Sequence, residues 1–480
     1  MPRGSVVSLA TLPQELMDEI SLHLQHRSDL SNLSLVCKAI RAQTLRLLYN
    51  EITMTVQGTH GDTSQQPKVP PANFLLRTLL QKPALAEYIS ALHLQSVGNL
   101  TLQHGSPRTE CPSMVRPASY PGLVKDAIWR LGLGETKITP QLLANILEND
   151  YEAVATFLPL LCPRITSLTF GLDLLIRNPY LESILACASP SQSPGQTPRF
   201  QHLKTIRLGT STDSRGVTSG FRVNLPHRTP DATLKLESYY PIFYVPELET
   251  LQASLPFRER YKKITWPTNS PPILSTLTTL QLPECSLSPE MLCDILSTTP
   301  SLRRLDYDCW QHPSSHGLFD ASVLQKALDC VKDTLVHLEI KVGFWSKETV
   351  QPEEEGEEWV QKACSLREMA SLKHLSVCPC VLLGWHRQSA PMLADVLPPQ
   401  LNSIRFATEF EYYAGYEGSD EEDGFEWEEE YLMEQIRHFL QDGKWKSSTP
   451  HLRRLGVFYR IWEDRDGLQK LCAQNGLSSY

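Results

Sequence analysis

The chain is 480 residues long, more than one ordinary hydrophobic core holds, which indicates two or more folded units or an elongated array. Hydrophobic residues make up 41% of the chain and charged residues 21%, a balance that excludes global disorder. The formal charge is −9, and the segment 417–430 alone holds nine acidic residues and no basic one, so the rest of the chain is neutral. No net basic field therefore favours nucleic acid or an anionic membrane as a partner.

The N-terminal sequence Met1–Leu16 lacks the unbroken apolar stretch of a secretory signal. No uncharged apolar run reaches the roughly 18–20 residues that span a bilayer. Twelve cysteines are too sparse for a disulfide scaffold in a chain of this length, so we expect reduced thiols. The sequence favours a soluble protein of the cytoplasm, the nucleus or both.

Residues 9–52 predict a compact unit of three short helices. Pro13 suits a first helical turn, and the next apolar residues recur every four positions on one helix face, at Leu16, Ile20 and Leu24. A second helix is predicted from a cap at Asp29 to Ile40, and a third carries Leu45, Leu48, Tyr49 and Ile52. So small a core buries little apolar surface, and we expect the unit to pack against something else.

A linker and connecting helix are expected over 53–85, and the remainder, 86–480, repeats the pattern apolar-x-x-apolar-x-apolar. The alternating end of the pattern fits a short strand with every second side chain facing a core. Proline stands two positions before five of the last nine copies, which indicates a repeat array. The ten copies start at Ile89, Ile165, Leu203, Leu248, Leu277, Leu302, Leu335, Leu372, Leu401 and Leu452.

Two copies, Leu277–Cys285 and Leu372–Cys380, extend to a cysteine and resemble the leucine-rich-repeat consensus. The predicted fold is therefore α/β: a short three-helix unit followed by an irregular, leucine-rich-repeat-like solenoid whose parallel strands line a horseshoe. The acidic segment 417–430 is expected to be its largest insertion. Helices are predicted between copies at Pro289–Leu296, Ala321–Val331, Trp359–Met369 and Tyr431–Leu440.

Catalytic and cofactor motifs are missing from the sequence. There is no Walker loop, no Gly-x-Ser-x-Gly elbow and no His-Glu-x-x-His. The spacing Cys309-x-x-His312-x-x-x-His316 is typical of metal ligands, but a structural zinc needs four ligands and no Cys-x-x-Cys pair occurs to complete it. We therefore expect neither an enzyme, nor a metal site, nor a cofactor.

Residues 12–49 contain Leu-Pro-x-Glu-Leu at the start, then Asp29-Leu30-x-x-Leu33-Ser34-Leu35-Val36-Cys37-Lys38-x-x-Arg41, and Leu48-Tyr49. This segment resembles an F-box, the element that binds the Skp-family adaptor of cullin-based SCF ubiquitin ligases. Tyr49 stands where many members carry Trp, and the Leu-Tyr ending with repeats behind it looks most like the large fungal group of F-box proteins. The resemblance implies adaptor contact through Leu12, Pro13, Leu16, Ile20, Leu24, Leu33, Val36, Cys37 and Tyr49.

The alternative for those nine residues is a purely internal three-helix core. At the level of function, the resemblance implies a non-catalytic substrate-recognition subunit, linked through the adaptor to a cullin and a RING subunit and holding an unknown protein target. The alternative is an F-box scaffold or interaction protein without a ubiquitination substrate. No nucleic acid and no membrane is expected as a partner.

The target is expected on the open face of the repeat strands. In each copy the leucines turn inward, so the residues at alternate positions point to the opposite face. Neighbouring strands lie about 4.8 Å apart, so these side chains should form one mixed-charge patch. The candidate target-binding residues are Arg304, Asp306, Asp308, His337, Glu339, Lys341, His374, Ser376, Arg405 and Arg454.

Overall fold

The structure is a computed structural model of the full chain, and its contacts divide the chain into two compact units. Unit 1 comprises Met1–Ser219 with Val245–Glu247, and unit 2 comprises Gly220–Tyr244 with Leu248–Tyr480. Within the residues described below, no helix is both long and apolar enough to cross a membrane. The structure describes residues 12–24, 26–57, 69–97, 120–133, 139–171, 174–175, 178, 180–186, 200–209, 211–212, 218–219, 236–254, 263–266, 271–311, 319–346, 360–407, 412–414, 429–443, 445–458 and 465–479.

Unit 1 begins with three helices, α1 (Gln14–Leu22), α2 (Arg27–Ser34) and α3 (Lys38–Asn50). The single second helix expected from Asp29 to Ile40 is wrong, because α2 ends at Ser34 and Cys37 has an extended backbone that starts α3. Asp29 lies in the first turn of α2 and His26 occupies the cap position. The chain thus turns sharply between α2 and α3, at the apolar residues Leu35–Cys37.

The sheet of unit 1 has the strand order β1 (Glu51–Gln57), β2 (Ala91–Val97), β3 (Ser167–Phe170) and β4 (Thr205–Leu208), with all neighbours parallel. Ile52, expected at the end of a helix, is a buried strand residue, and β1 includes residues 53–57 of the expected linker. A two-stranded antiparallel ladder joins β5 (Ser211–Thr212) to β6 (Thr218–Ser219). The other helical segments are α4 (Ala72–Gln81), η2 (Pro83–Tyr88), α5 (Pro121–Arg130), α6 (Thr139–Leu147), α7 (Tyr151–Phe157), η3 (Leu158–Leu161) and α9 (Leu181–Ala186).

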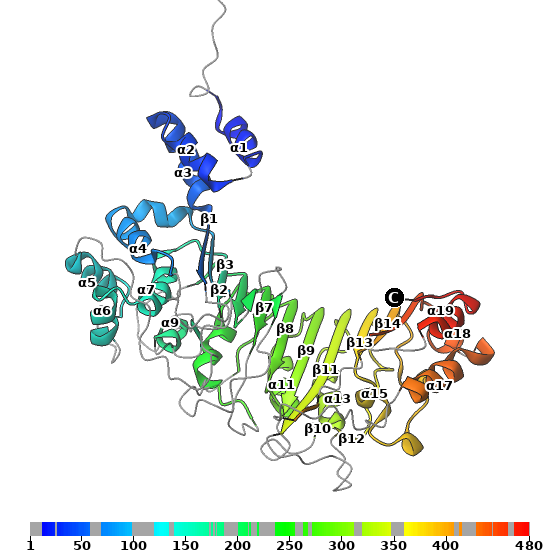
Figure 1. Cartoon of the computed structure of the whole chain (residues 1–480). Helices are drawn as coiled ribbons and strands as arrows, with labels where there is room; N and C mark the ends of the chain where they lie inside the picture. Colours follow the sequence, from blue (N-terminus) through cyan, green and yellow to red (C-terminus); the bar gives the residue numbers. More distant parts are fainter. Residues whose placement is uncertain are drawn as a thin grey trace, which may run out of the picture. The chain divides into compact units, whose positions relative to one another are not determined.

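The sheet of unit 2 is also parallel, and its strands follow one another in chain order (Figure 1). β15 (Tyr412–Ala414) is the exception, since it pairs with the far end of β11. A separate pair joins β10 (Phe319–Asp320) to β12 (Val360–Gln361). The strands in order are β7 (Thr250–Ala253), β8 (Thr279–Cys285), β9 (Arg304–Gln311), β11 (His337–Ser346), β13 (His374–Val377), β14 (Ser403–Ala407), β16 (Arg454–Phe458) and β17 (Ser478–Ser479).

Helices fill the connections of unit 2. The helix predicted at Pro289–Leu296 is confirmed as α11, whose first turn is capped by the Ser288 hydroxyl accepting from the Met291 N–H. The helix predicted at Trp359–Met369 is wrong, because the chain forms β12 and then turns that bury Cys364 and Leu366. The remaining helices are η4 (Leu236–Tyr244), α13 (Ala321–Asp329), α15 (Pro379–Leu383), η5 (Arg387–Ser389), α16 (Leu393–Val396), α17 (Glu429–Leu440), η6 (Gln441–Gly443), α18 (Trp445–Ser448) and α19 (Arg465–Gln474).

The repeated apolar pattern fixes where the strands begin. In all ten copies a strand starts two residues after the first apolar residue, and that first residue is buried. The alternating apolar residues that follow, such as Leu305 and Tyr307 on β9, are buried as well. The pattern therefore supplies one continuous apolar face within each unit.

One backbone position holds the strands of unit 2 in register. In each copy but the last, the residue that follows the first apolar residue accepts hydrogen bonds at its backbone carbonyl from two N–H groups at the start of the next strand. Arg303 O, for example, accepts from Val336 N at 2.8 Å and from His337 N at 2.9 Å. We call these positions the carbonyl row. Its members are Glu249, Thr278, Arg303, Val336, Lys373, Asn402 and Arg453, and the last accepts from Ser478 N.

Candidate protein-interaction surfaces

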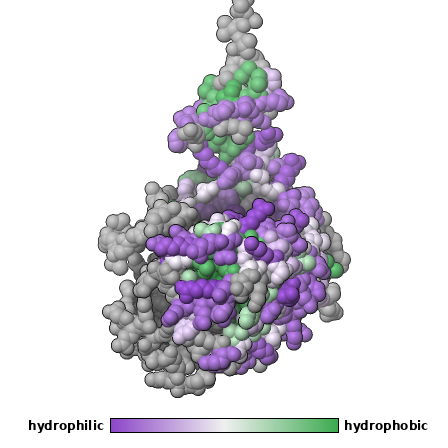
Figure 2. Space-filling view, turned by 90° about the vertical axis from the view of Figure 1, so that its right-hand side faces the viewer, coloured by the Kyte–Doolittle hydropathy of each residue, from purple (hydrophilic) through white to green (hydrophobic). Residues whose placement is uncertain are grey.

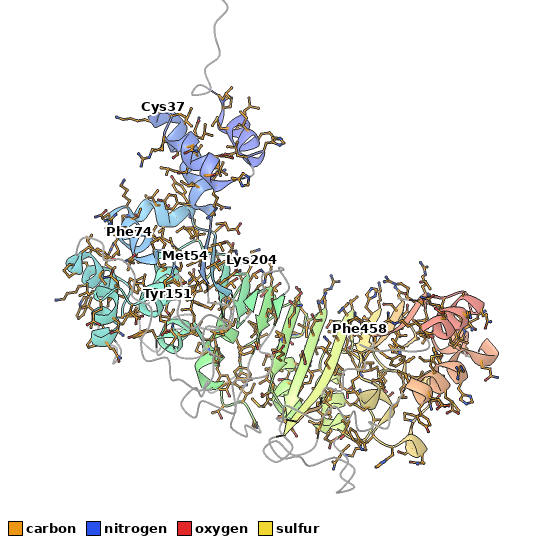
Figure 3. The ribbon with its side chains drawn as sticks, in the orientation of Figure 1. Cys37, Met54, Phe74, Tyr151, Lys204 and Phe458 are labelled. Atoms are coloured by element: carbon orange, nitrogen blue, oxygen red, sulfur yellow. The ribbon has the colours of Figure 1, made fainter. Side chains whose placement is uncertain are left out.

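Apolar side chains are exposed on the three N-terminal helices. Leu35 is 76% exposed, Val36 66% and Leu16 50%, and Ile20 and Cys37 are exposed too. We call these five residues the helical face. Figure 2 shows hydrophobic surface gathered over this part of unit 1, and Figure 3 places Cys37 at the junction of α2 and α3. Contiguous exposed apolar surface is a common feature of protein-interaction sites.

The interior of the same helices is very small. Its fully buried apolar residues among those described are Met17 and Ile40, joined by the buried hydroxyl of Thr44, which donates to Ile40 O. An exposed ion pair, Arg46 Nη2 to Asp18 Oδ2 at 2.8 Å, ties α3 to α1. None of the nine residues expected at the adaptor is buried in this core. The nine residues therefore lie outside the fully buried interior, although four of them are half-buried.

The nine residues differ in exposure. Pro13, Leu16, Ile20, Val36 and Cys37 are exposed, whereas Leu12, Leu24, Leu33 and Tyr49 are half-buried. The sequence did not single out Leu35, the most exposed large apolar residue among the described side chains of residues 12–50. The sequence feature that indicates exposure of Leu35 is the run Leu33–Cys37, because one helix face cannot bury so many consecutive residues.

The ten residues expected at the target-binding site lie on adjacent strands of unit 2. The register pairs Arg304 with His337, Asp306 with Glu339 and Asp308 with Lys341. It continues from His337 to His374, and from Glu339 through Ser376 to Arg405. Arg454 is paired with Ser403, beside His374. The sheet thus brings all ten together on the face opposite the buried leucines, which we call the open face.

Ion pairs and hydrogen bonds form two clusters on the open face, one around Asp306 and one around Glu339. Asp306 accepts from Arg304 Nη2 at 2.8 Å and from Gln281 Nε2 at 2.6 Å. Glu339 accepts from Lys341 Nζ at 3.1 Å and Arg405 Nη2 at 3.5 Å. Because both carboxylates are about four-fifths buried, these pairs are screened less than ordinary surface pairs.

Two histidines lie side by side in the middle of this face. The rings of His337 and His374 are 5.8 Å apart between centroids, and His374 Nδ1 lies 2.9 Å from Ser403 Oγ. Partial burial lowers the pKa of His337, and the positive charge of Arg304 lowers it further. The negative charge of Asp306 acts in the opposite direction and raises this pKa. Partial burial also lowers the pKa of His374, with Arg454 and Lys373 acting in the same direction. Both shifts favour the neutral imidazole.

Asp306, His337 and Glu339 offer three ligand atoms of the kind that bind metal ions, all within 4.8 Å of one another. Both carboxylates, however, already face guanidinium or ammonium groups, which would repel a divalent ion. The other metal-like group of the sequence rests on His312 and His316, which lie outside the described residues. The acidic segment lies outside them as well, except for Glu429 and Glu430 at the start of α17.

Two residues of the open face differ from expectation. Ser376 is only 6% exposed and its hydroxyl accepts from Arg405 Nε at 3.1 Å, so it orients Arg405 and leaves little surface for a partner. Phe458, which the sequence did not single out, is 57% exposed at the end of β16 (Figure 3). The Arg405 guanidinium carbon lies 5.6 Å from the centre of its ring. Exposed aromatic and arginine side chains are typical anchors of protein interfaces.

Comparison with protein-family models finds no match to this chain, and a search of curated proteins finds none either. The functional reading therefore rests on the residues and on the surfaces that they form.

Proposed function

We propose that this protein is the substrate-recognition subunit of an SCF-type ubiquitin ligase, with α1–α3 as an F-box that binds the Skp-family adaptor. The observation that carries the proposal is the helical face, whose residues lie outside the small core of Met17 and Ile40. The motif resemblance over residues 12–49 falls on the same three helices. Burial of Leu16, Leu35 and Val36 against an adaptor would remove an apolar patch that the free unit leaves in water.

The remainder of the chain acts, in this proposal, as a leucine-rich-repeat-like solenoid that holds a protein target. Parallel strands that pair in chain order and bury the repeated leucines support the solenoid. The open face offers partly exposed charges, such as Arg304 and Lys341, beside the exposed ring of Phe458. Such a surface suits reversible, charge-selective binding. The adaptor recruits the cullin and the RING subunit, and the receptor contributes by proximity alone.

The adaptor interaction is tested by co-purification of the full chain with the Skp-family adaptor. Leu35→Ala combined with Val36→Ala removes two highly exposed apolar residues, and adaptor affinity should fall about 30-fold or more, because truncating an interface anchor often costs about 2 kcal/mol. Ser31→Ala combined with Asn32→Ala, on exposed positions of α2, is the matched control and should bind normally. Unchanged adaptor capture by the Leu35/Val36 variant would remove the basis of the proposal.

The ligase role is tested by reconstitution with adaptor, cullin, RING subunit, E1, E2 and ubiquitin. Ubiquitin chains should form on the captured target only when the adaptor and cullin are both present. The chain alone with E1, E2 and ubiquitin should form none. Adaptor capture without any ubiquitin transfer would instead favour a scaffold that uses the adaptor for another purpose.

A further inference from the structure

The carbonyl row of unit 2 carries three basic side chains at regular intervals. Arg303, Lys373 and Arg453 occupy it at the starts of β9, β13 and β16, and all three are exposed. Val336 and Asn402 occupy the row on the strands between them. Within the described part of the chain, none of the three cationic groups takes part in an ion pair or a side-chain hydrogen bond. We call these three residues the basic row.

The surroundings of the basic row add positive charge. The residues that follow Arg303 and Arg453 are Arg304 and Arg454, at the same edge of the sheet. The lowered pKa of His374 has burial as its first cause and then two cations, Arg454 and Lys373, with no carboxylate acting against them. Acidic side chains near this edge include Glu249, two strands from Arg303 in the row, the exposed Asp333 before β11, and Glu368 and Asp306, which pair with Lys332 and Arg304. The edge around β13 therefore has a local excess of cations.

The spacing of the row is set by the sheet. Neighbouring strands lie about 4.8 Å apart, so alternate strands are about 9.6 Å apart. Arg303 and Lys373 stand on alternate strands, and so do Lys373 and Arg453. A peptide in the polyproline II conformation rises about 3.1 Å per residue with three residues per turn, so every third side chain returns to one face after about 9.3 Å. In a β-strand, by contrast, residues three apart point to opposite faces.

We infer that the basic row binds an acidic segment of the target protein in the polyproline II conformation, with Asp or Glu at every third position. One carboxylate would face each of Arg303, Lys373 and Arg453, and the segment would run across the strands. This inference deepens the proposed function by giving the target a chemical class. Peptide binding itself does not depend on the proposed function; only the conclusion that the bound target is then ubiquitinated rests on it. A duplex nucleic acid fits less well, because one strand presents a phosphate about every 3.4 Å of axis and the chain has a net charge of −9.

The test uses the purified full chain and two peptides of equal composition, each labelled with fluorescein at its N-terminus and amidated at its C-terminus. One is (Glu-Pro-Pro) repeated four times, and the other joins the same four Glu in one block to the eight Pro. Binding is measured by fluorescence anisotropy at low salt, where exposed charges are least screened. The spaced peptide should bind several-fold more tightly than the blocked one. Equal affinity for both peptides would mean that binding lacks the spacing proposed.

Protein variants identify the site. Neutralising the basic row with Arg303→Gln, Lys373→Gln and Arg453→Gln should weaken binding of the spaced peptide about tenfold, since each exposed pair contributes modestly. Neutralising three exposed cations elsewhere, with Lys326→Gln, Arg367→Gln and Lys470→Gln, gives the same change of net charge and should leave affinity unchanged. Because all these side chains are exposed, thermal denaturation should show both variants folded. Unchanged affinity of the basic-row variant would overturn the inference.

Two further readouts separate this inference from its alternatives. Bound carboxylates near His374 should raise the pKa of that imidazole in an NMR titration, against the present lowering by burial, Arg454 and Lys373. Duplex DNA that binds more tightly than the peptide, and loses binding in the same variant, would assign the row to nucleic acid instead. Adaptor capture should be unaffected in both triple variants. Peptide binding without adaptor capture would support this inference and refute the proposed function. Adaptor capture without peptide binding would support the proposed function and refute this inference.

Discussion

Arg405 on β14 reaches across β13 to Glu339 on β11, with 3.5 Å between Nη2 and Oε1. On the way its Nε donates to Ser376 Oγ at 3.1 Å. One guanidinium therefore joins three strands on the open face. Lys341 adds a second cation to the same carboxylate oxygen at 3.1 Å, which makes Glu339 the centre of the network.

Replacing Glu339 with Gln should destabilise the protein measurably. The change leaves Lys341 and Arg405 facing one another without the carboxylate that separates them. We expect a loss of about 1 kcal/mol, seen as a melting temperature lower by about 2–4 °C. Glu368→Gln is the control, because its pair with Lys332 is exposed and should contribute little. Equal effects of the two changes would show that the network adds nothing beyond ordinary surface pairs.

Alanine at both Leu12 and Pro13 should reduce adaptor affinity by roughly 30-fold or more, if each anchor contributes about 1 kcal/mol or more. Leu12 is half-buried and Pro13 exposed, so the folded unit should tolerate the change. The contacts of this turn that hold α1 use backbone carbonyls, namely Leu12 O with Gln43 Nε2 and Pro13 O with Met17 N. Surface plasmon resonance against immobilised adaptor gives the affinity, and circular dichroism checks the fold. Wild-type affinity would exclude this turn from the interface.

Thiol reactivity should follow burial. Burial raises the pKa of the Cys285 and Cys380 thiols, and both are fully inaccessible, so neither should react with iodoacetamide in the native protein. Cys37 is exposed and should react first among the thiols that the structure describes. Cys330 is exposed as well, but partial burial of its thiol and the neighbouring Cys293 raise the pKa of that thiol to about 11. Cys330 should therefore react more slowly than Cys37. Peptide mapping by mass spectrometry gives the order, and early labelling of Cys285 would contradict it.

Cys285→Ser and Cys380→Ser should each lower the melting temperature. A hydroxyl would replace a weakly polar thiol in an apolar environment, and a buried hydroxyl needs a hydrogen-bond partner. Cys37→Ser, at an exposed position, should leave the melting temperature unchanged. Metal content measured by elemental analysis should be the same in all variants. Zinc lost with either buried substitution would reverse this reading of the two thiols.

Stability should fall as the pH drops below about 6.5. The pKa values of His93, His337 and His374 are lowered in the folded protein, in each case first by burial. Unfolded histidines therefore take up protons at a higher pH than these three, so protonation favours unfolding below the unfolded value of about 6.5. The melting temperature should be lower at pH 5 than at pH 7.5.

The double variant His337→Gln and His374→Gln should reduce this pH dependence. His451→Gln, at an exposed position, is the control and should keep the wild-type slope. Burial alone would raise the pKa of Asp320, but hydrogen bonds from Ser322 and the charge of Lys362 lower it below its ordinary value. The stability that Asp320 contributes is therefore lost only at lower pH, below about 3.8. A double variant with an unchanged slope between pH 5 and 7.5 would place the effect on other groups.

The strands could be predicted from the sequence because a parallel strand packed on one face needs an apolar residue at every second position. That requirement located the strand beginning after Leu302 as well as the one after Leu452, although the copies differ in length. The helices were harder to place. Apolar residues at Leu33–Cys37 suggested a continuous helix, whereas several of them are exposed and Cys37 is extended. An apolar residue that is exposed gives the same sequence pattern as one that is buried.

The composition of the open face was predictable and its contacts were not. Alternation along β9 and β11 placed Asp306 beside Glu339, as the register has them. Which charge pairs with which depends on side-chain rotamers, so the bidentate contact of Arg304 with its own strand neighbour Asp306 left no trace in the pattern. The burial of Ser376 depends on the arginine that covers it, which is twenty-nine residues away in sequence.

The carbonyl row has a consequence for how the chain tolerates change. In the main sheet of unit 2, with β15 set aside, each strand is hydrogen-bonded to the sheet strands that precede and follow it along the chain, so each pairing closes the loop of a single connection. The length of a connection can then vary without shifting the register of the strands on either side. The entropy of closing a flexible loop rises by only about 0.6 kcal/mol for each doubling of its length. An acidic segment such as 417–430 can therefore lengthen or shorten over evolutionary time while β14 and β16 keep their pairing.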